Sequence, residues 1–554
     1  MAYGLLGEKL SGTVFQKIYD KIGRNKYEMW ERTPDEVDSF MKEAVFLGAF
    51  VDKAYREKVL PYVEKFSREA ETAGSANTVI YRDGHLTGYH TEYAALASVL
   101  RKMKLSLEGK KVLIFGDGET GRIARLLAAD QGASHIYQIP ENEEGKMDDS
   151  AYEECADAQI LIQTGACGTA PDLEDCPVDL GRLPEISSVV ETIWDPLRTS
   201  LVLEAEKRGI PARGGLFFLV AQAIHAVECF LNTTYEYEKI NDIYHQILNE
   251  RRNLVLVGMS QVGKTTVGTM LSQRLNRKLE DTDQLIIAKE GCEITEIFAK
   301  GGEPYFRDVE SEVVRQVALE HELIIATGGG AVLREKNVEA LKKNGLIIFL
   351  DRPLDQLTPT DDRPLANSAE KIYGLFRTRY PIYKSVCDRH VVNHLSPDIV
   401  TGKILRVMEN RKKLLVINGP SLHMLGVRDP DIYGYTSYNR LYHNIKVHAM
   451  ELGVEVECYQ SNHEGDLVDK ILNAYGVMDG IVINPGAYAY TSLAMLDALR
   501  IAAVPTVEVH LFEEEKDEFR RTSYIRSACK TAIIGHGPDG YLEAMDLLAK
   551  GDQE

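Results

Sequence analysis

The sequence NLVLVGMSQVGKT, residues 253–265, joins a short apolar run to a glycine-rich loop and decides the fold of the middle of the chain. The apolar run has the length and composition of a strand that is buried on both faces of a parallel sheet. The loop matches GxxxxGK[ST] and opens a helical stretch, the context in which backbone N–H groups converge on phosphate. We therefore predict a nucleotide site, with Lys264 on the β- and γ-phosphates and Thr265 on Mg²⁺. The nucleotide-binding residues expected are Gly258, Gly263, Lys264, Thr265 and Thr266.

Short apolar runs of the same kind recur along the whole chain and alternate with helical stretches. This alternation predicts βαβ units with largely parallel sheets, so the expected fold class is a multi-domain α/β protein. A chain of 554 residues has room for three or four domains. Two polar or charged stretches, 233–253 and 406–413, each precede a new strand and mark boundaries. The expected strands are 111–116, 158–165, 253–258, 323–330, 346–351, 413–419, 480–486, 506–511 and 531–537.

Composition limits the class of protein and the kind of partner. The net charge of −20 gives a surface that repels phosphate backbones, so we expect no nucleic-acid partner. The eight cysteines are scattered without CxxC pairs or zinc spacing, which is typical of reduced thiols in a cytoplasmic protein. No apolar run reaches the roughly 18 residues of a membrane span. The N-terminus MAYGLLGEKLSGTVF also lacks the basic start and long apolar core of a signal peptide, so we expect a cytoplasmic location and no membrane partner.

The residues that follow the phosphate loop indicate the second substrate. LEDTDQLI supplies two aspartates at a strand end, and EIFAKGGEPYFRDVE supplies an arginine and a glutamate. ATGGGAV supplies three consecutive glycines, and DDRPL and RTRYPIY supply further arginines. In this order and spacing the block resembles shikimate kinase over its whole length. One departure is Gln261, where that family usually has glycine in the phosphate loop.

The resemblance to shikimate kinase implies a role for each of these side chains. Asp281 would help to hold Mg²⁺ through water, and Asp283 would bind the acceptor hydroxyls and take the proton from the attacking one. Arg307 and Arg379 would grip the substrate carboxylate, a task that suits the arginine fork. Arg363 would cover the nucleotide from a mobile lid. The glycines that complete the implied substrate site are Gly328, Gly329 and Gly330.

The C-terminal block carries a second set of motifs. They are LLVINGPSLHMLGVRDPDIYG (414–434), YQSNHEG (459–465), INPGAYAYTS (483–492) and VEVHL (507–511). Together they resemble type II 3-dehydroquinate dehydratase across the block. That family has a flavodoxin-like fold, forms oligomers and removes water from 3-dehydroquinate through an enolate. The resemblance therefore implies a lyase, and a homo-oligomer formed through this block.

The same resemblance implies a base, an acid and an enolate site. Tyr433 would remove the proton next to the ketone, and Arg428 would lower the phenol's pKa, since a pKa of ~10 leaves little phenolate at pH 7. Asn418, at a strand end, would face the developing enolate oxygen. His510, with Glu508 on the same strand face, would give a proton to the departing hydroxyl. The substrate-binding residues implied are Asn484, Asp497 and Arg520.

Three positions of the C-terminal block depart from the dehydratase pattern. Phe512 and Glu513 stand where the family usually has Ser-Asn, and Tyr490 stands where it has histidine. These positions belong to the pocket for the substrate carboxylate and leave the base, the acid and the enolate site in place. We therefore expect an active dehydratase with weaker substrate binding.

The N-terminal block begins with YGLLGEKL and contains four further motifs, GSANTV (74–79), GYHTEY (88–93), VLIFGDGETG (112–121) and GGLFFLVAQA (214–223). Together they resemble shikimate dehydrogenase, less closely than the other two blocks resemble their families. The fold implied is a substrate domain followed by a Rossmann-type domain. GDGETG fits GxGxxG after a strand, which is the frame for a dinucleotide.

The acidic residues around this frame do not suit the cofactor. Asp117 and Glu119 place two carboxylates beside the position of a pyrophosphate. Glu141 stands where an acid favours NAD, whereas the dehydrogenase family usually prefers NADP and has a basic residue. NAD(P) is therefore a doubtful cofactor of this chain.

The catalytic pair of the dehydrogenase family is also changed. That family uses lysine and aspartate, and alignment places Arg56 and Glu92 at these positions, with His90 at a preceding asparagine. Arginine cannot lose its proton at usable pH, so it can bind a carboxylate but cannot shuttle a proton. Lys53 or Lys58 could substitute if one of them pointed at Glu92. The residues of this degenerate site are Arg56, Asn77, Glu92, Gly116, Gly118, Gly121 and Gln222.

The three resemblances are to enzymes of three successive steps of the shikimate pathway, so we predict a multifunctional enzyme of that pathway. It would combine an ATP- and Mg²⁺-dependent kinase for the 3-hydroxyl of shikimate with a dehydratase. Its dehydrogenase-like region would have low or no activity. One alternative is a fully trifunctional enzyme. Another is a P-loop regulatory ATPase with two ligand-sensing domains, which predicts ATP hydrolysis independent of shikimate. The expected domains are a dehydrogenase-like substrate domain over 1–100 with a helical return at 214–235, a Rossmann-like domain over 101–213, a linker over 236–250, a kinase domain over 251–408 and a dehydratase domain over 413–554.

Overall fold

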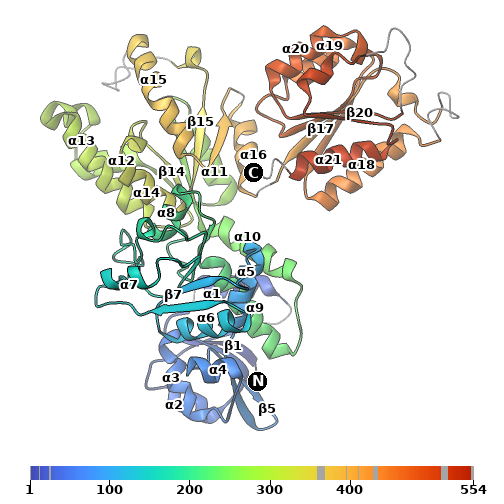
Figure 1. Ribbon diagram of the computed structural model, residues 1–554. Coiled ribbons are helices and arrows are strands. Elements are labelled where there is room, and N and C mark those ends of the chain that lie inside the picture. The colour runs from blue at the N-terminus through green and yellow to red at the C-terminus, as the bar shows by residue number, and fades with distance from the viewer. Residues whose placement is uncertain are drawn as a thin grey trace. The chain divides into compact units, whose positions relative to one another are not determined.

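We describe a computed structural model of the chain, shown in Figure 1. The chain divides into two compact units. One consists of Met1–Val257, Leu275–Ile348 and Thr360–Asp388, and the other of Gly258–Arg274, Phe349–Pro359 and Arg389–Glu554. Both units are α/β, and most strand pairs are parallel, as the sequence predicts. The residues described are 2–10, 13–23, 27–357, 368–394, 396–409, 411–427, 435–512 and 522–550.

The first sheet is mixed and has the strand order β2-β1-β3-β5-β6-β4. The pairs β1–β2, β1–β3 and β4–β6 are parallel, whereas β3–β5 and β5–β6 are antiparallel. A tight turn at Asp83 and Gly84 joins β5 directly to β6, which makes that pair a hairpin. The sheet therefore departs from a fully parallel one. Its strands are β1 (Ala2–Gly7), β2 (Glu28–Glu31), β3 (Phe46–Val51), β4 (Lys65–Phe66), β5 (Thr78–Arg82) and β6 (His85–Tyr89). Its helices are α1 (Val14–Ile22), α2 (Val37–Glu43), α3 (Arg56–Val59), α4 (Arg68–Ala73) and α5 (Glu92–Met103).

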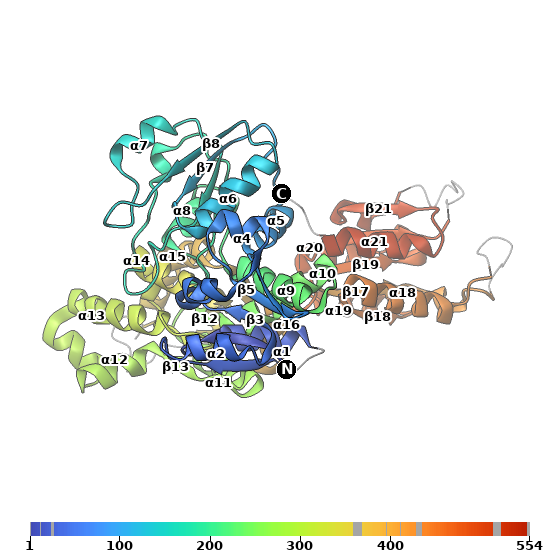
Figure 2. The same cartoon turned by 90° about the horizontal axis from the view of Figure 1, so that it is seen from below.

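The second sheet has the order β11-β10-β9-β7-β8, and its strand pairs are parallel. The stretch expected to be a linker forms helix α10, which lies beside α9 in both views (Figures 1 and 2). Ile240, Ile243 and Ile247 of α10 are buried in the same core as α9, which explains why this polar stretch is helical. The strands are β7 (Lys111–Phe115), β8 (His135–Ile139), β9 (Ile160–Gln163), β10 (Ser188–Glu191) and β11 (Ala212–Arg213). The helices are α6 (Glu119–Asp130), α7 (Asp149–Glu154), α8 (Ser200–Lys207), α9 (Leu216–Leu231) and α10 (Tyr237–Arg251).

The third sheet carries the phosphate loop and has the order β13-β14-β12-β15-β16. Its central strand β12 is completely buried, as its continuous apolar sequence predicts. The strands are β12 (Asn253–Val257), β13 (Leu279–Asp281), β14 (Ile324–Ala326), β15 (Gly345–Asp351) and β16 (Arg389–Val392). The helices are α11 (Lys264–Leu275), α12 (Thr282–Glu290), α13 (Ile294–Ala318), α14 (Glu335–Asn344), α15 (Ala369–Val386) and α16 (Pro397–Met408).

The fourth sheet is parallel and has the order β18-β17-β19-β20-β21, which is the flavodoxin-like order. Helices α18 and α21 cover one face, and α19 and α20 cover the other (Figure 1). The strands are β17 (Lys413–Asn418), β18 (Glu455–Gln460), β19 (Gly480–Asn484), β20 (Thr506–His510) and β21 (Thr531–Ile534). The helices are α18 (Tyr438–Leu452), α19 (Glu464–Leu472), α20 (Leu493–Ala502) and α21 (Asp539–Lys550).

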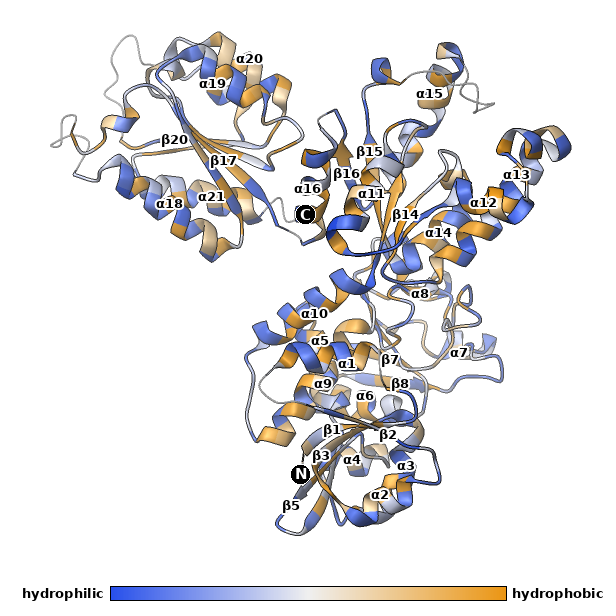
Figure 3. Cartoon of the chain, turned by 180° about the vertical axis from the view of Figure 1, so that it is seen from behind, coloured by the Kyte–Doolittle hydropathy of each residue, from blue (hydrophilic) through white to orange (hydrophobic). Residues whose placement is uncertain are grey.

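Every strand that the sequence predicts is present, and most of them end a few residues earlier than predicted. Figure 3 shows that the central strands are largely hydrophobic, whereas the helices have mixed faces. All eight cysteines are free thiols, as expected. Among the helices of the described segments, none is long and apolar enough to cross a membrane.

Candidate functional sites

The phosphate loop follows strand β12, and its backbone requires glycine at two positions. Gly258 and Gly263 have φ angles of 145° and 87°, in the region that side chains avoid. A Cβ atom at Gly258 would lie 2.5 Å from the carbonyl oxygen of Leu350. Gln261, the departure from glycine, has a φ of 67°, and a non-glycine residue in this region costs about 1–2 kcal/mol. The loop thus keeps its turn at Gln261 at a modest cost.

Lys264 is the first residue of α11 and folds back over the loop. Its Nζ donates hydrogen bonds to the carbonyl oxygens of Gly258 at 3.0 Å and Met259 at 2.8 Å, and the residue is 8% exposed. Phosphate oxygens would be stronger acceptors for this ammonium than carbonyl oxygens are. Thr265 and Thr266 are exposed in the first turn of α11, where the helix terminus favours an anion. These residues fit a nucleotide triphosphate with its Mg²⁺.

Two aspartates meet the glycine loop that follows β14. Asp281 caps α12, and its Oδ1 accepts a hydrogen bond from the backbone N–H of Asp283 at 3.0 Å. Thr282 is buried, and its Oγ1 accepts the N–H of Gly328 at 2.9 Å. A Cβ atom at Gly328 would lie 2.7 Å from Oδ1 of Asp283, so glycine is needed here to make room for the carboxylate. Sequence analysis missed Thr282, although it lies inside the LEDTDQLI motif.

Arg307 lies against the same glycine loop. Its guanidinium donates hydrogen bonds to Glu310 at 2.7 Å and to Glu303 at 3.0 Å. A Cβ atom at Gly330 would lie 2.1 Å from Nη1 of Arg307, so the guanidinium occupies the space that a side chain would take. Burial raises the pKa of Glu310 above its ordinary value, although Arg307 opposes this shift.

Arg379 reaches the loop from α15. Its Nη1 donates a hydrogen bond to the carbonyl oxygen of Gly329 at 3.1 Å, and the hydroxyl of Tyr383 donates to the same oxygen. The structure therefore brings Arg307, Arg379 and Asp283 together around one glycine loop. Tyr383 was not predicted, because a tyrosine one helical turn from an arginine is usually a packing residue.

The second site lies at the carboxyl ends of β17, β19 and β20. Asn418 and Asn484 are paired neighbours on adjacent strands, and both are buried. On β20, Nε2 of His510 lies 2.7 Å from Oε1 of Glu508, and Nε of Arg526 donates to Oε2 of Glu508 at 3.1 Å. Burial acts to raise the pKa of Glu508, but hydrogen bonds from His510 and Ser523 and the charge of Arg526 outweigh it and lower the pKa. Glu508 is therefore an anion that orients the imidazole.

A buried tyrosine behind this site was not predicted. The hydroxyl of Tyr541, on α21, donates a hydrogen bond of 2.5 Å to Oδ1 of Asn418. Tyr541 is fully buried, and burial raises the pKa of its hydroxyl well above the ordinary value. The hydrogen bond fixes the Asn418 amide so that its Oδ1 faces the helix. The sequence gives no signal for this contact, because Tyr541 lies on the apolar face of an ordinary amphipathic helix.

The remaining predicted residues lie on the surface, beside the second site, in the core or outside the described residues. Asp497 is exposed on α20. The ring centroid of Tyr490 lies 6.4 Å from that of His510, so the departure from histidine adjoins the acid. Phe512 packs against the core between the sheet and helices α18 and α21. Arg363, Arg428, Tyr433, Glu513 and Arg520 lie outside the described residues.

The third candidate site lies in the N-terminal region, where the GDGETG turn has the geometry of a dinucleotide frame. Gly116 has a φ of 107°, and a Cβ atom at Gly121 would lie 2.2 Å from the carbonyl oxygen of Gly116. A Cβ atom at Gly118 would meet nothing within 4 Å, so the backbone there is open to a ligand. Glu141 follows β8, and its Oε1 accepts the N–H of Ala166 at 3.0 Å.

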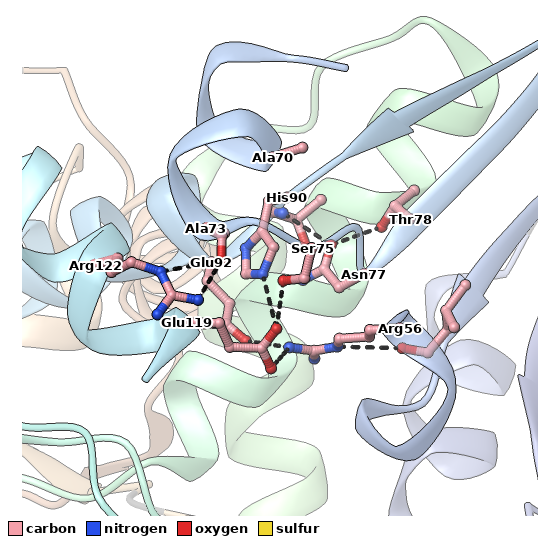
Figure 4. A network of polar contacts seen from close by, with 12 residues as sticks. Arg56, Ala70, Ala73, Ser75, Asn77, Thr78, His90, Glu92, Glu119 and Arg122 are labelled. Atoms are coloured by element: carbon pink, nitrogen blue, oxygen red, sulfur yellow. Dashed lines mark hydrogen bonds and ion pairs between the residues drawn. The ribbon is translucent and has the colours of Figure 1, made fainter. Parts of the chain in front are cut away.

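Arg56, which the sequence alignment matched to the catalytic lysine of the dehydrogenase family, is paired with two carboxylates (Figure 4). Its Nη1 lies 3.0 Å from Oε1 of Glu92 and 2.6 Å from Oε1 of Glu119. Ser75 also donates a hydrogen bond to Glu119. Burial acts to lower the pKa of Arg56, but the two carboxylates outweigh it and raise the pKa. Burial opposes the ionisation of Glu119, but contacts with His90, Arg56 and Ser75 lower its pKa to about 2. The charges of Arg56 and Glu119 therefore persist at neutral pH.

Neither nearby lysine substitutes for the lost one. Lys53 is exposed, and Lys58 is exposed with its Nζ 3.5 Å from the carbonyl oxygen of Pro34. Arg56 is the residue that points at Glu92. Asn77 and Gln222 are buried, as a substrate site would require.

Comparison with known proteins agrees with this division of sites. The sequence pattern of the shikimate kinase family matches residues 260–409, and that of class II dehydroquinases matches residues 412–549. A 3-dehydroquinate dehydratase of Clostridium perfringens is 47% identical over 140 residues, which are 25% of this chain and 96% of that protein. A shikimate kinase of Clostridium botulinum is 41% identical over 164 residues, which are 29% of this chain and 99% of that protein. A crystal structure of shikimate dehydrogenase 1 from Peptoclostridium difficile is 24% identical with a TM-score of 0.39, and covers 44% of this chain and 97% of that one.

Proposed function

The chain belongs to the shikimate kinase and class II dehydroquinase families, and on that premise we propose that it phosphorylates the 3-hydroxyl of shikimate and dehydrates 3-dehydroquinate to 3-dehydroshikimate. We assign the kinase to residues 251–408, the dehydratase to 413–554 and a dehydrogenase-like region to 1–235. The convergence of Arg307, Arg379 and Asp283 on one glycine loop carries the kinase assignment. We place the enzyme in the cytoplasm as a homo-oligomer formed through its dehydratase.

In the kinase, catalysis depends mainly on the positioning of the two substrates and on positive charge around the transferred phosphate. Lys264 and the loop amides would hold the phosphates of ATP, and Thr265 and Asp281 would hold Mg²⁺, which neutralises phosphate charge when bound. Arg307 and Arg379 would bind the shikimate carboxylate as two forks. Asp283 would accept the proton of the 3-hydroxyl while that oxygen forms a bond to the γ-phosphorus and the bond to the ADP oxygen breaks. The glycine loop supports this arrangement, because its missing side chains leave room for Asp283 and Arg307.

In the dehydratase, the reaction is the loss of water across two neighbouring carbons. Tyr433 would take the proton next to the ketone, and the electrons would move onto the ketone oxygen as an enolate. The side-chain amide of Asn418 would stabilise that oxygen, since preorganised dipoles stabilise developing charge. His510 would then protonate the departing hydroxyl as its C–O bond breaks. The Glu508–His510 distance of 2.7 Å supports this role, because the carboxylate holds the ring and stabilises its protonated form.

In the N-terminal region, the ion pairs of Arg56 with Glu92 and Glu119 argue against dehydrogenase activity. Reduction of 3-dehydroshikimate needs a group that gives a proton to the new hydroxyl, and the guanidinium of Arg56 cannot do so at neutral pH. Glu92 and Glu119 raise its pKa further. Glu119 also lies in the turn that would receive the pyrophosphate, and its negative charge would repel that anion. We therefore assign this region low or no dehydrogenase activity.

One purified sample tests the three assignments. We expect ADP and shikimate 3-phosphate from ATP and shikimate, and 3-dehydroshikimate from 3-dehydroquinate. We expect no oxidation of NADPH or NADH when 3-dehydroshikimate is supplied. Oxidation at a rate similar to the kinase rate would establish a trifunctional enzyme and would contradict the role given to Arg56. ATP hydrolysis without shikimate, and no transfer to it, would instead favour a regulatory ATPase.

The substitution Gly330→Ala should raise the KM for shikimate by about 10-fold or more, with a small effect on the KM for ATP. The added methyl would lie 2.1 Å from Nη1 of Arg307, so the guanidinium must leave its position beside the loop. A misplaced fork loses bonds to the carboxylate that are worth about 1.5–3 kcal/mol. The backbone of Gly330, with a φ of −108°, accepts alanine without strain. Steady-state kinetics in both substrates would measure this, and an equal rise in both KM values would contradict it. Gly374→Ala, at a helical glycine with no atom within 4 Å of its new methyl, is the control.

The substitution Tyr541→Phe should lower the kcat of dehydration by about 10-fold and leave its KM nearly unchanged. The hydroxyl holds Asn418 through Oδ1, and without it the amide can turn away from the enolate. Dehydration measured over a range of substrate concentrations separates kcat from KM. Tyr438→Phe removes a second hydroxyl that hydrogen-bonds Asn418, so comparison of the two variants shows which contact holds the amide. A change confined to thermal stability would show that Tyr541 is only a packing residue.

A further inference from the structure

Three metal-ligating side chains converge in the N-terminal region, at the place where the dehydrogenase-like catalytic pair is altered. They are His90, Glu92 and Glu119, and one ligand atom of each lies within 4.8 Å of the other two. His90 and Glu92 flank the start of α5, and Glu119 begins α6 (Figure 4). Their side chains are 0%, 4% and 13% exposed. Buried carboxylates this close to an imidazole are unlike the exposed acidic clusters that are common on protein surfaces.

Several polar atoms that face this cluster lack a hydrogen-bond partner among the described residues. Both ring nitrogens of His90 lack one, and so do Oε2 of Glu92 and Nδ2 of Asn77. The nearest acceptor for His90 is Oε2 of Glu119, 3.7 Å from Nε2 and beyond hydrogen-bond distance. Leaving a buried polar group unsatisfied costs about 1–3 kcal/mol, and folded proteins rarely leave several in one place. The unsatisfied polar atoms around His90 are independent of the two carboxylates, and they point to a bound ligand.

The charges of the cluster favour a cation. Arg56 binds Oε1 of Glu92 and Oε1 of Glu119, so it occupies one edge of each carboxylate. Oε2 of Glu119 lies 3.7 Å from Nε2 of His90 and also accepts a hydrogen bond from Ser75, whereas Oε2 of Glu92 has no hydrogen-bond partner among the described residues. With a neutral imidazole, the two carboxylates and one guanidinium give the buried cluster a net charge of about −1. In metal sites, the carboxylate oxygen that does not bind the metal commonly accepts a hydrogen bond from a neighbouring side chain. Arg56 is in the position to donate such hydrogen bonds to Glu92 and Glu119.

We propose that His90, Glu92 and Glu119 bind one divalent cation of the zinc class, with Arg56 orienting the two carboxylates from outside. One imidazole nitrogen and two carboxylate oxygens suit Zn²⁺, whereas Mg²⁺ and Ca²⁺ prefer oxygen ligands alone. Three protein ligands leave a fourth position for water or a small anion. Zn²⁺ binds such ligands at about 2.0–2.2 Å, so side-chain shifts of about 1 Å would close the set.

This inference goes beyond the proposed kinase and dehydratase functions and does not rest on them. Because Glu119 belongs to the glycine-rich turn and the other two ligands lie at the start of α5, the cation would link that turn to α5. The geometry of the three side chains and the unsatisfied atoms around them carry the proposal.

Titration of the full-length chain with Zn²⁺ after chelator treatment, without nucleotide, tests the proposal. We expect one strong equivalent per chain by calorimetry and by elemental analysis. His90→Asn and, separately, Glu119→Gln should each weaken that equivalent by about 100-fold or more. His85→Asn is the matched control, since His85 is exposed and pairs with Glu64 at 2.6 Å. Kinase activity in each variant reports that the chain is folded.

Cobalt distinguishes this site from adventitious binding to the free thiols. Co²⁺ at the proposed ligands should give ligand-field absorption without a thiolate charge-transfer band, and His90→Asn should abolish it. A stoichiometric site that survives both His90→Asn and Glu119→Gln would overturn the proposal. So would the absence of any strong equivalent in the wild-type chain, in which case Arg56 alone balances the two carboxylates. If His90→Asn fails to fold, Glu119→Gln decides the question.

Discussion

The substitution Lys264→Ala should lower the kcat of phosphoryl transfer to shikimate by about 100- to 1,000-fold, while the same protein dehydrates 3-dehydroquinate at the wild-type rate. Lys264 supplies the cation that folds back over the phosphate loop, with Nζ held 3.0 Å and 2.8 Å from two loop carbonyls. Charge that builds up on phosphate oxygens during transfer loses a preorganised donor when this ammonium is removed. One such donor is worth about 10²–10³ in kcat.

The control for Lys264→Ala is Lys289→Ala on α12, where the lysine forms an ion pair with Glu312. Lys289→Ala should leave both activities unchanged, because exposed pairs contribute little. Formation of shikimate 3-phosphate, followed directly, separates transfer from hydrolysis of ATP. An unaltered kcat in Lys264→Ala would contradict the assignment of the loop to the nucleotide. A loss of dehydration in the same variant would mean that the substitution disturbs the whole chain.

The sequence predicts the sites best where a backbone constraint and a side-chain motif coincide. Gly258, Gly263 and Gly330 were all expected, because positive φ angles or close approach to another group admit no other residue there. The buried parallel strands were also expected, since continuous apolar runs have few alternative structures. Alignment with the dehydrogenase family put Arg56 and Glu92 at the positions of the catalytic pair and left open which basic residue faces Glu92. In the structure that residue is Arg56.

Three features could not be predicted, for different physical reasons. The antiparallel pairing of β5 and β6 depends on a tight turn, and the apolar pattern alone does not distinguish it from a crossover. Helix α10 has a polar sequence, and it is helical because a single apolar stripe packs on α9. Glu119 was expected to oppose a pyrophosphate, but its partnership with Arg56 joins residues 63 positions apart and depends on the tertiary fold.

The second large effect is expected at His510. His510→Ala should lower the kcat of dehydration by about 10²–10⁴-fold, the usual contribution of a positioned proton donor, and leave phosphoryl transfer unchanged. The imidazole is 6% exposed, and Glu508 holds it at 2.7 Å, so solvent cannot readily replace it as the acid.

Glu508 offers a way to separate the acid from its support. Glu508→Gln keeps a hydrogen-bond acceptor for His510 but removes the charge that stabilises the imidazolium, so its kcat should fall by less than that of His510→Ala. His536→Ala is the control, since that exposed histidine pairs with Glu543 in the same domain. A kcat in His510→Ala within a factor of a few of the wild type would show that another group delivers the proton. Equal losses of kcat in Glu508→Gln and His510→Ala would instead mean that Glu508 acts as more than a support.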